Sequence, residues 1–211
     1  MAAGSGQRLG AGRAKALVEL GGRPLFAWAV DAARAASSIG AIVVAAPPGD
    51  EDGFATDGVS VVSGGASRSE SVAAALGAVS DENVVIHDAA RPFAEPVLFD
   101  RVVTALESDT GLAAAVVAVA VPDTIKRSGP NGEVAETLDR SALRAIQTPQ
   151  AFRREALAAA LDAAPHVLAS ATDDASLVEI AGGRVALVEG SVRNMKITTP
   201  EDLVMAEALL G

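Results

Sequence analysis

Short apolar runs alternate along the chain with longer segments in which apolar and polar residues are mixed. The runs predict buried strands at residues 42–46, 59–62, 83–87, 112–121 and 185–188. The mixed segments predict helices at residues 25–36, 69–78, 97–107, 154–163 and 200–210. This alternation is typical of an α/β fold whose mainly parallel sheet is covered by helices.

The last predicted helix carries the clearest start signal. Thr199 stands where a side chain would cap the helix, Pro200 takes the first helical position, and Glu201 and Asp202 lie near the positive end of the helix dipole.

One segment breaks the alternation. Residues 122–150 resemble an extended excursion with a turn at Gly129-Pro130-Asn131-Gly132, which we interpret as a β-arm leaving the domain body. No linker or repeat interrupts the rest, so we expect a single domain over residues 1–211 with residues 122–150 as its arm.

Composition narrows the range of functions. Half of the 211 residues are apolar but only 3% are aromatic, so the core depends on aliphatic side chains, and cysteine is absent. The formal net charge of −10 would repel a nucleic-acid backbone. No apolar run reaches the roughly 18 residues that span a bilayer, and no signal peptide is recognisable. We expect a cytoplasmic protein without nucleic-acid or membrane partners.

A glycine-rich stretch opens the chain, from Ala2 to Gly10, and Lys15 follows it. Gly4 and Gly6 allow backbone N–H groups to turn toward a phosphate, and Arg8 and Lys15 would add positive charge beside it. By itself the stretch also fits an ordinary flexible turn.

The segment His87-Asp88-Ala89-Ala90-Arg91-Pro92 follows a predicted strand. Ligands of open α/β sheets collect at the carboxyl ends of strands, where a carboxylate such as Asp88 is well placed to hold Mg²⁺. The alternative is that Asp88 caps a turn and pairs with Arg91. For His87 we expect an orienting or packing role rather than acid–base catalysis.

Two further segments contain polar side chains beside turns. Gly65 and Ser71 lie where a strand leads into a helix, which suits recognition of a polar ligand edge, although a plain link capped by Ser69 fits as well. Lys196 lies in a short extended segment before the last helix and could project a point charge into a cleft, although by itself the segment fits an ordinary surface lysine better.

In this order the segments resemble the cytidylyltransferases of the non-mevalonate isoprenoid pathway. The shared pattern comprises AAG-x-G-x-R, GG-x-x-R-x-x-SV, HDAARP, DT-x-K, a DR pair in the arm, TPQ, and K-[IV]-T-x-x-x-D-L. The resemblance covers the whole chain and implies a Rossmann-like fold.

The resemblance also implies roles for individual residues. Catalytic contacts to the triphosphate are expected from Arg8, Lys15 and Lys196. Nucleotide binding is expected from Ala2, Ala3, Gly4, Gly6, Gly65, Ser71 and Asp88, with Asp88 also holding Mg²⁺. Binding of the phosphorylated acceptor is expected from Arg91, Thr124, Arg140 and Thr148.

The implied enzyme is a nucleotidyltransferase of isoprene biosynthesis. It transfers CMP from CTP to 2-C-methyl-D-erythritol 4-phosphate and releases pyrophosphate and 4-diphosphocytidyl-2-C-methyl-D-erythritol. The family forms homodimers through the arm, so Arg140 is expected to act on the partner's site. A ribitol 5-phosphate cytidylyltransferase and an inactive nucleotide-binding homologue remain as alternatives.

The sequence departs from the family pattern at three places. The short apolar strand that usually precedes the AAG loop is absent, so we expect the central position of the sheet to lack its first strand. Ala14 stands where proline usually precedes the lysine, and Ala66 replaces a commonly acidic residue. We expect Ala14 to loosen the approach of Lys15, and Ala66 to weaken a cytidine contact.

Overall fold

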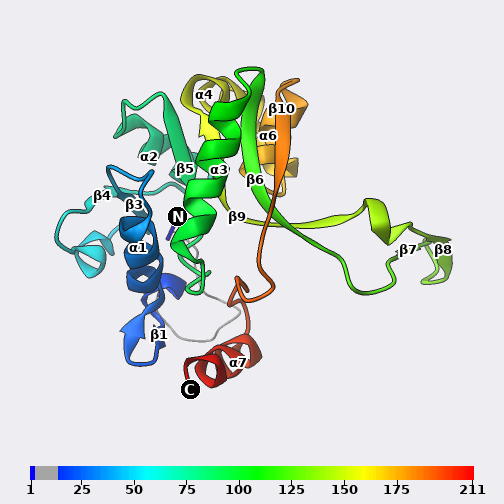
Figure 1. Ribbon diagram of the computed structural model, residues 1–211, viewed down its shortest axis with the longest axis horizontal. Coiled ribbons are helices and arrows are strands. Elements are labelled where there is room, and N and C mark those ends of the chain that lie inside the picture. The colour runs from blue at the N-terminus through cyan, green and yellow to red at the C-terminus, as the bar shows by residue number, and fades with distance from the viewer. Residues whose placement is uncertain (3–13) are drawn as a thin grey trace.

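Strands at the centre and helices on both sides build the body of the molecule, and one thin arm projects from it (Figure 1). The computed structural model describes residues 1–2 and 14–211. The longer strands are β3 (Val43–Ala46), β4 (Ser60–Ser63), β5 (Asn83–Ile86), β6 (Leu112–Ala120), β9 (Arg144–Arg153) and β10 (Arg184–Glu189). The helices are α1 (Leu25–Ala35), α2 (Arg68–Gly77), α3 (Pro96–Ser108), α4 (Arg154–Leu161), α5 (Pro165–Ser170), α6 (Asp174–Ile180) and α7 (Pro200–Leu210).

The main sheet has four strands in the order β10-β6-β9-β5. Strand β10 runs parallel to β6, whereas β9 is antiparallel to both β6 and β5. Strands β5, β6 and β10 therefore share one direction and β9 alone runs against them. The α/β class and the five predicted strands are confirmed, with small shifts at their ends.

Helices cover both faces of this sheet, and successive side chains of β6 point alternately to one face and to the other. Ala114 and Val116 pack with apolar residues of α2, α4 and α6 in one core cluster. Ala115 and Val117 point to the opposite face, where they pack against α3. The apolar run of β6 is thus buried on both faces, as expected of a strand covered by helices on both sides.

The helices predicted from the sequence are present, and their ends are set by local chemistry. Thr199 caps α7, as predicted, and it also forms a reciprocal capping box with Asp202. The start of α2 differs, because its cap is Ser67, which accepts from the Glu70 N–H, rather than Ser69. The short helices α5 and α6 were not predicted; α6 begins at a capping box of Asp173 and Ser176.

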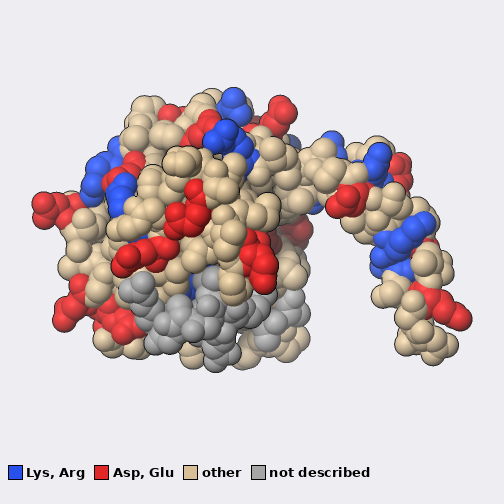
Figure 2. Space-filling view, turned by 90° about the horizontal axis from the view of Figure 1, so that it is seen from below, with Lys and Arg blue, Asp and Glu red and all other residues tan. Residues whose placement is uncertain are grey.

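The arm is shorter than the sequence suggested. Its hairpin consists of β7 (Lys126–Ser128) and β8 (Val134–Thr137), both exposed, followed by a single 3-10 turn at Arg140–Ala142. Residues 144–150 do not belong to the arm but to β9, which crosses the main sheet. Figure 2 shows the arm as a narrow projection that carries side chains of both charges.

Strands β3 and β4 form a separate parallel pair, and no strand joins β3 to β5 within residues 1–2 and 14–211. A largely apolar cavity of about 410 Å³ lies between β3 and β5, lined by side chains that include Val44, Val84 and Ile86. We call this cavity the strand slot.

Met1 and Ala2 occupy one end of the strand slot. The Met1 amino group donates to the His87 carbonyl at 2.6 Å, and the Met1 carbonyl accepts from Ala89 N–H at 3.1 Å. On the other side, Ala2 N–H donates to the Ala45 carbonyl at 3.0 Å. Met1 and Ala2 therefore bridge the two sheets as residues of a parallel strand would. That the family's first strand is missing from this position stays a prediction.

Helices long and apolar enough to cross a membrane are absent from the part of the chain that the structure describes.

Because the strand slot is open, we expect the protein to become more stable when the chain is extended before Met1. Adding a valine-rich segment of about five residues before Met1 should pair with β3 and β5 and bury at least one side chain, worth about 2 kcal/mol. For a chain of this size that corresponds to a melting temperature roughly 4–8 °C higher.

Thermal unfolding followed by circular dichroism would measure this shift. The matched control has the same segment with prolines at alternate positions, which cannot donate to the ladder and should give no gain. An equal melting temperature for both extended chains would contradict the pairing.

Candidate active site

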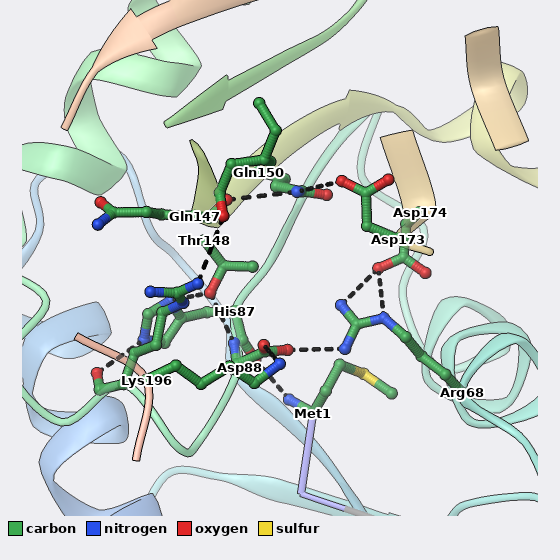
Figure 3. Close-up of polar contacts among 12 residues, drawn as sticks. Met1, Arg68, His87, Asp88, Gln147, Thr148, Gln150, Asp173, Asp174 and Lys196 are labelled. Atoms are coloured by element: carbon green, nitrogen blue, oxygen red, sulfur yellow. Dashed lines mark hydrogen bonds and ion pairs between the residues drawn. The ribbon is translucent and has the colours of Figure 1, made fainter. Parts of the chain in front are cut away.

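A polar cleft of about 440 Å³ opens beside β9 and is the candidate active site. Its charged and hydroxyl-bearing lining includes Arg68, Asp88, Arg91, Thr148 and Lys196. These residues come from the start of α2, the turn after β5, the middle of β9 and the segment between β10 and α7. The fold thus gathers motifs that lie far apart in the sequence, as Figure 3 shows.

Asp88 is the central charge of the cleft. The residue is only 6% exposed, and its two carboxylate oxygens contact different cations. Lys196 Nζ lies 2.6 Å from Oδ2, and Arg68 Nη1 lies 2.7 Å from Oδ1. Burial alone would raise the pKa of Asp88, but the charges of Arg68 and Lys196 outweigh it and hold the pKa well below its usual value. Asp88 is therefore ionised.

His87 is held in one orientation beside Asp88. Its Nε2 lies 3.2 Å from the Arg91 carbonyl, which can only accept, so Nε2 carries the proton. Its Nδ1 then accepts from the Thr148 hydroxyl at 3.0 Å, while the same hydroxyl oxygen accepts from Asp88 N–H. Burial lowers the pKa of His87 to about 4, so the ring is neutral. These contacts fix the ring, and an orienting or packing role of His87 rather than acid–base catalysis stays a prediction.

The Lys196 segment is fixed by hydrogen bonds to β9 and to the turn after β5. Asn194, fully buried, donates through Nδ2 to the Thr148 carbonyl at 2.9 Å. Arg91 Nη1 donates to the Asn194 carbonyl at 2.7 Å, and Ile197 N–H donates to the Ala90 carbonyl at 2.8 Å. These bonds place Lys196 against Asp88 although it follows a different strand.

Gly65 and Ser71 lie together at the start of α2. Gly65 N–H donates to the Ser71 hydroxyl oxygen at 3.0 Å, and Ser71 is 1% exposed. A Cβ at Gly65 would come within 2.2 Å of the Glu70 Cβ, so this turn requires glycine. Neighbouring Ala66 is exposed and donates its N–H to the Glu70 carboxylate at 2.7 Å.

The residues at the N-terminus are described in part. Ala2 is buried in a core cluster with Ala14, Ala16 and Ala89, which brings the short turn that begins at Lys15 next to the Asp88 segment. Ala14 has φ −51° and ψ 132°, a conformation open to proline, so the alanine keeps the backbone path that a proline would impose. The predicted residues Ala3, Gly4, Gly6 and Arg8 lie outside the described residues.

Two predicted acceptor residues lie away from the cleft. Thr124 and Arg140 are exposed on the arm, where Arg140 Nη1 donates to the Pro122 carbonyl. Within one chain the structure brings Arg91 and Thr148 to the cleft, but not Thr124 or Arg140.

Two residues of the site were not assigned by sequence reasoning. Arg68 belongs to the GG-x-x-R pattern, but nothing in the spacing indicated that its side chain would reach Asp88. Asp174, 1% exposed, pairs with Arg68 at 2.7 Å from the start of α6. The acidic pair Asp173-Asp174 before a helix was the only signal, and α6 itself was not predicted.

Asp88 could bind a divalent cation whose other ligands come from a substrate. Clusters of three or more His, Cys, Asp or Glu side chains able to hold a metal are absent from residues 1–2 and 14–211. A buried, ionised carboxylate in a polar cleft nevertheless fits Mg²⁺, which often binds proteins through one or two carboxylates and takes substrate phosphates and water as its remaining ligands.

Comparison with known proteins places this chain in a family. A family model described as 2-C-methyl-D-erythritol 4-phosphate cytidylyltransferase matches residues 1–211. The chain belongs to this family. A relative of that name from Frankia casuarinae is 45% identical over 215 residues, covering 100% of this chain and 79% of the relative. One from a Synechococcus strain is 44% identical over 220 residues, covering 99% and 93%.

Solved structures of the family share the fold. The crystal structure of the cytidylyltransferase from Thermus thermophilus has a TM-score of 0.80 and 41% identity, with 93% of each chain covered. The structure from Francisella tularensis has a TM-score of 0.82 and 29% identity, covering 98% of this chain and 95% of that one. The expected Rossmann-like fold is confirmed.

The neutral, buried His87 predicts loss of stability in acid. Its pKa is about 4 in the folded protein, below the 6.5 of a free histidine, so the unfolded chain binds the extra proton first as pH falls. Stability from this group is therefore complete above pH 6.5 and declines toward pH 4. Between pH 7.5 and 5 the loss should be about 2 kcal/mol.

Urea unfolding at both pH values would measure this loss, and the His87→Gln variant should lack it. The variant is the control for other groups that titrate in the same range, including the Met1 amino group, whose burial lowers its pKa to about 6. Equal pH dependence in both proteins would refute the assignment.

Proposed function

We propose that this protein transfers a cytidylyl group from CTP to 2-C-methyl-D-erythritol 4-phosphate and releases pyrophosphate. The observation that carries the proposal is the contact of Lys196 and Arg68 with a buried, ionised Asp88 in the polar cleft of a chain that belongs to the cytidylyltransferase family. Two cationic side chains beside one carboxylate suit a triphosphate and its metal ion. Their local positive charge can attract this anionic ligand although the net charge of the protein is −10.

The reaction needs little proton transfer. A phosphate oxygen of the acceptor attacks the α-phosphorus of CTP, a P–O bond forms, and the bond to the pyrophosphate leaving group breaks. Because the nucleophile is already an anion, no strong base is required. This agrees with a site whose one histidine is neutral and has both ring nitrogens engaged. Catalysis then depends on positioning and on cations facing the phosphates.

Asp88 is the residue that would hold Mg²⁺ together with the phosphates of CTP. When bound, the ion would supply positive charge to the triphosphate. Lys196, now paired with Asp88, can turn its ammonium to the phosphates, and we assign Arg8 and Lys15 to the same triphosphate by family resemblance.

The cytidine is assigned to the N-terminal loop and the start of α2. Ala2, Ala3, Gly4 and Gly6 would contribute backbone groups, and the buried turn of Gly65 and Ser71 would offer a rigid polar edge.

The acceptor phosphate is assigned to Arg91 and Thr148 from the cleft itself. Both residues line the cleft, and Arg91 brings a positive charge to it that suits a phosphate group. Thr124 and Arg140 would join from the arm of a second subunit in a homodimer, since their own arm carries them away from the cleft (Figure 1).

We assign methylerythritol phosphate rather than ribitol 5-phosphate as the acceptor because of the family to which the chain belongs. The matching family model and the relatives above carry the methylerythritol phosphate name, which disfavours ribitol 5-phosphate. The Asp88–Lys196 contact disfavours an inactive binding protein, because simple binding has less need of a lysine against a buried carboxylate.

Activity should require Lys196. With CTP, Mg²⁺ and methylerythritol phosphate, the protein should form a CDP-conjugate and pyrophosphate, and Lys196→Met should lower the rate about 10²–10³-fold, as expected for a lost preorganised charge. Coupled pyrophosphate release would measure the rate, and mass spectrometry the conjugate.

Arg184→Met is the matched control, because Arg184 pairs with Asp109 on the exposed surface at 2.9 Å. It should retain the full rate. Ribitol 5-phosphate tests the acceptor, and its preference over methylerythritol phosphate would overturn the substrate assignment. Undiminished turnover by Lys196→Met would overturn the mechanism.

Mixing two inactive variants tests the arm. If Arg140 serves the partner's site, a heterodimer of Arg140→Ala and Lys15→Ala subunits contains one intact site and one doubly altered site. Random exchange in an equal mixture makes half of the dimers mixed, so about one quarter of the unmodified activity should return. No recovery, with mixed dimers demonstrated by native mass spectrometry, would assign Arg140 to its own chain.

A further inference from the structure

The guanidinium of Arg68 joins two carboxylates that belong to different elements. Its Nε and Nη2 both donate to Asp174 Oδ2, at 3.1 and 2.7 Å, and its Nη1 donates to Asp88 Oδ1 at 2.7 Å. Figure 3 shows the planar group lying between Asp174 and Asp88, with each contact on a different edge of the fork. Three of its nitrogen atoms are thus engaged.

Lys196 contacts the same Asp88 in a different manner. It makes one ion pair, Nζ to Oδ2 at 2.6 Å, and its side chain is 41% exposed. An ammonium is a compact point charge on a flexible stem, whereas a guanidinium presents a rigid fork. Lys196 can therefore turn from Asp88 to a phosphate, because Asp88 keeps Arg68 as a partner when Lys196 leaves.

Arg68 cannot leave so easily. Asp174 is 1% exposed, and departure of Arg68 would leave that carboxylate buried without its cation. Burial raises the pKa of Asp174 although the charge of Arg68 opposes this, which reflects how strongly the carboxylate needs a partner. The Arg68–Asp174 pair is thus the fixed half of the network.

We propose that Arg68 and Asp174 form a positioning pair that holds Oδ1 of Asp88, so that Oδ2, now paired with Lys196, is the oxygen released for the metal that accompanies CTP. This inference rests on the proposed function, in which Asp88 binds Mg²⁺. In this proposal Arg68 and Asp174 do not touch the substrate, and they act only by positioning Asp88.

Asp174 has an electrostatic part in this arrangement. A lone guanidinium beside Asp88 would repel a divalent cation, but Asp174 neutralises the charge of Arg68 while keeping its geometry. Removing the Asp174 charge therefore has two effects in one direction: Arg68 loses its anchor, and its full charge competes with the metal for Asp88.

The two helices that carry the pair do not depend on it for their start. Ser67 caps α2, and the capping box of Asp173 and Ser176 begins α6. Loss of the Arg68–Asp174 contact is therefore expected to leave both helices formed, and its effect on metal dependence can be separated from folding.

The test measures CTP binding by calorimetry over a series of Mg²⁺ concentrations, without acceptor and hence without turnover. Asp174→Asn should raise the half-saturating Mg²⁺ concentration about 10–100-fold, the range for lost partners of metal ligands. CTP affinity at saturating Mg²⁺ should change less than about threefold, because the phosphates keep their own ligands. Arg68→Lys should shift the Mg²⁺ requirement in the same direction.

Asp109→Asn is the matched control, since it also breaks an arginine–aspartate pair of 2.9 Å, but on the exposed surface. It should bind like the unmodified protein. Circular dichroism would show whether each variant is folded; if Asp174→Asn is not, Arg68→Lys decides.

Unshifted Mg²⁺ dependence in a folded variant would overturn the positioning pair while leaving the proposed function intact. Failure of the unmodified protein to form any CDP-conjugate would instead refute the function itself. The two failures are therefore distinguishable.

Discussion

The site depends on one buried negative charge held between two positive ones. Asp88 is almost fully buried, and it stays ionised because Arg68 and Lys196 each contact one of its oxygens. A carboxylate removed from water without such partners would take up a proton instead. The surrounding structure supports this arrangement: the hydrogen bonds of His87, Thr148 and Asn194 fix the backbones that present Asp88 and Lys196.

The same constraint links the core to the chemistry. Asp88 follows β5, an edge strand beside the strand slot, and the Met1 carbonyl accepts from the next residue, Ala89. The main sheet positions β9 and hence Thr148, and α2 and α6 pack on the same apolar face of this sheet, close enough for Arg68 to meet Asp174. Rigid packing of aliphatic side chains thus supplies the fixed geometry that a reaction driven by positioning requires.

The two cations beside Asp88 differ in how firmly they are held: Arg68 is fixed, whereas Lys196 can change its partner. Arg68 makes three hydrogen bonds from a planar fork, whereas Lys196 makes one contact from a flexible stem. In the free protein both neutralise Asp88, which keeps the buried carboxylate ionised. A triphosphate offers Lys196 an alternative partner but offers Arg68 none that would also satisfy Asp174.

Sequence alone determined the α/β class, most strands and helices, and the motifs around Asp88, Lys196, Arg91 and Thr148, because apolar periodicity and local motifs are properties of neighbouring residues. It could not determine that β9 belongs to the sheet rather than the arm, since strand pairing joins distant segments. Nor could it show Arg68 reaching both Asp88 and Asp174, because side chains from α2, α6 and the turn after β5 meet only once their helices pack on a shared sheet. Tertiary packing decided those contacts.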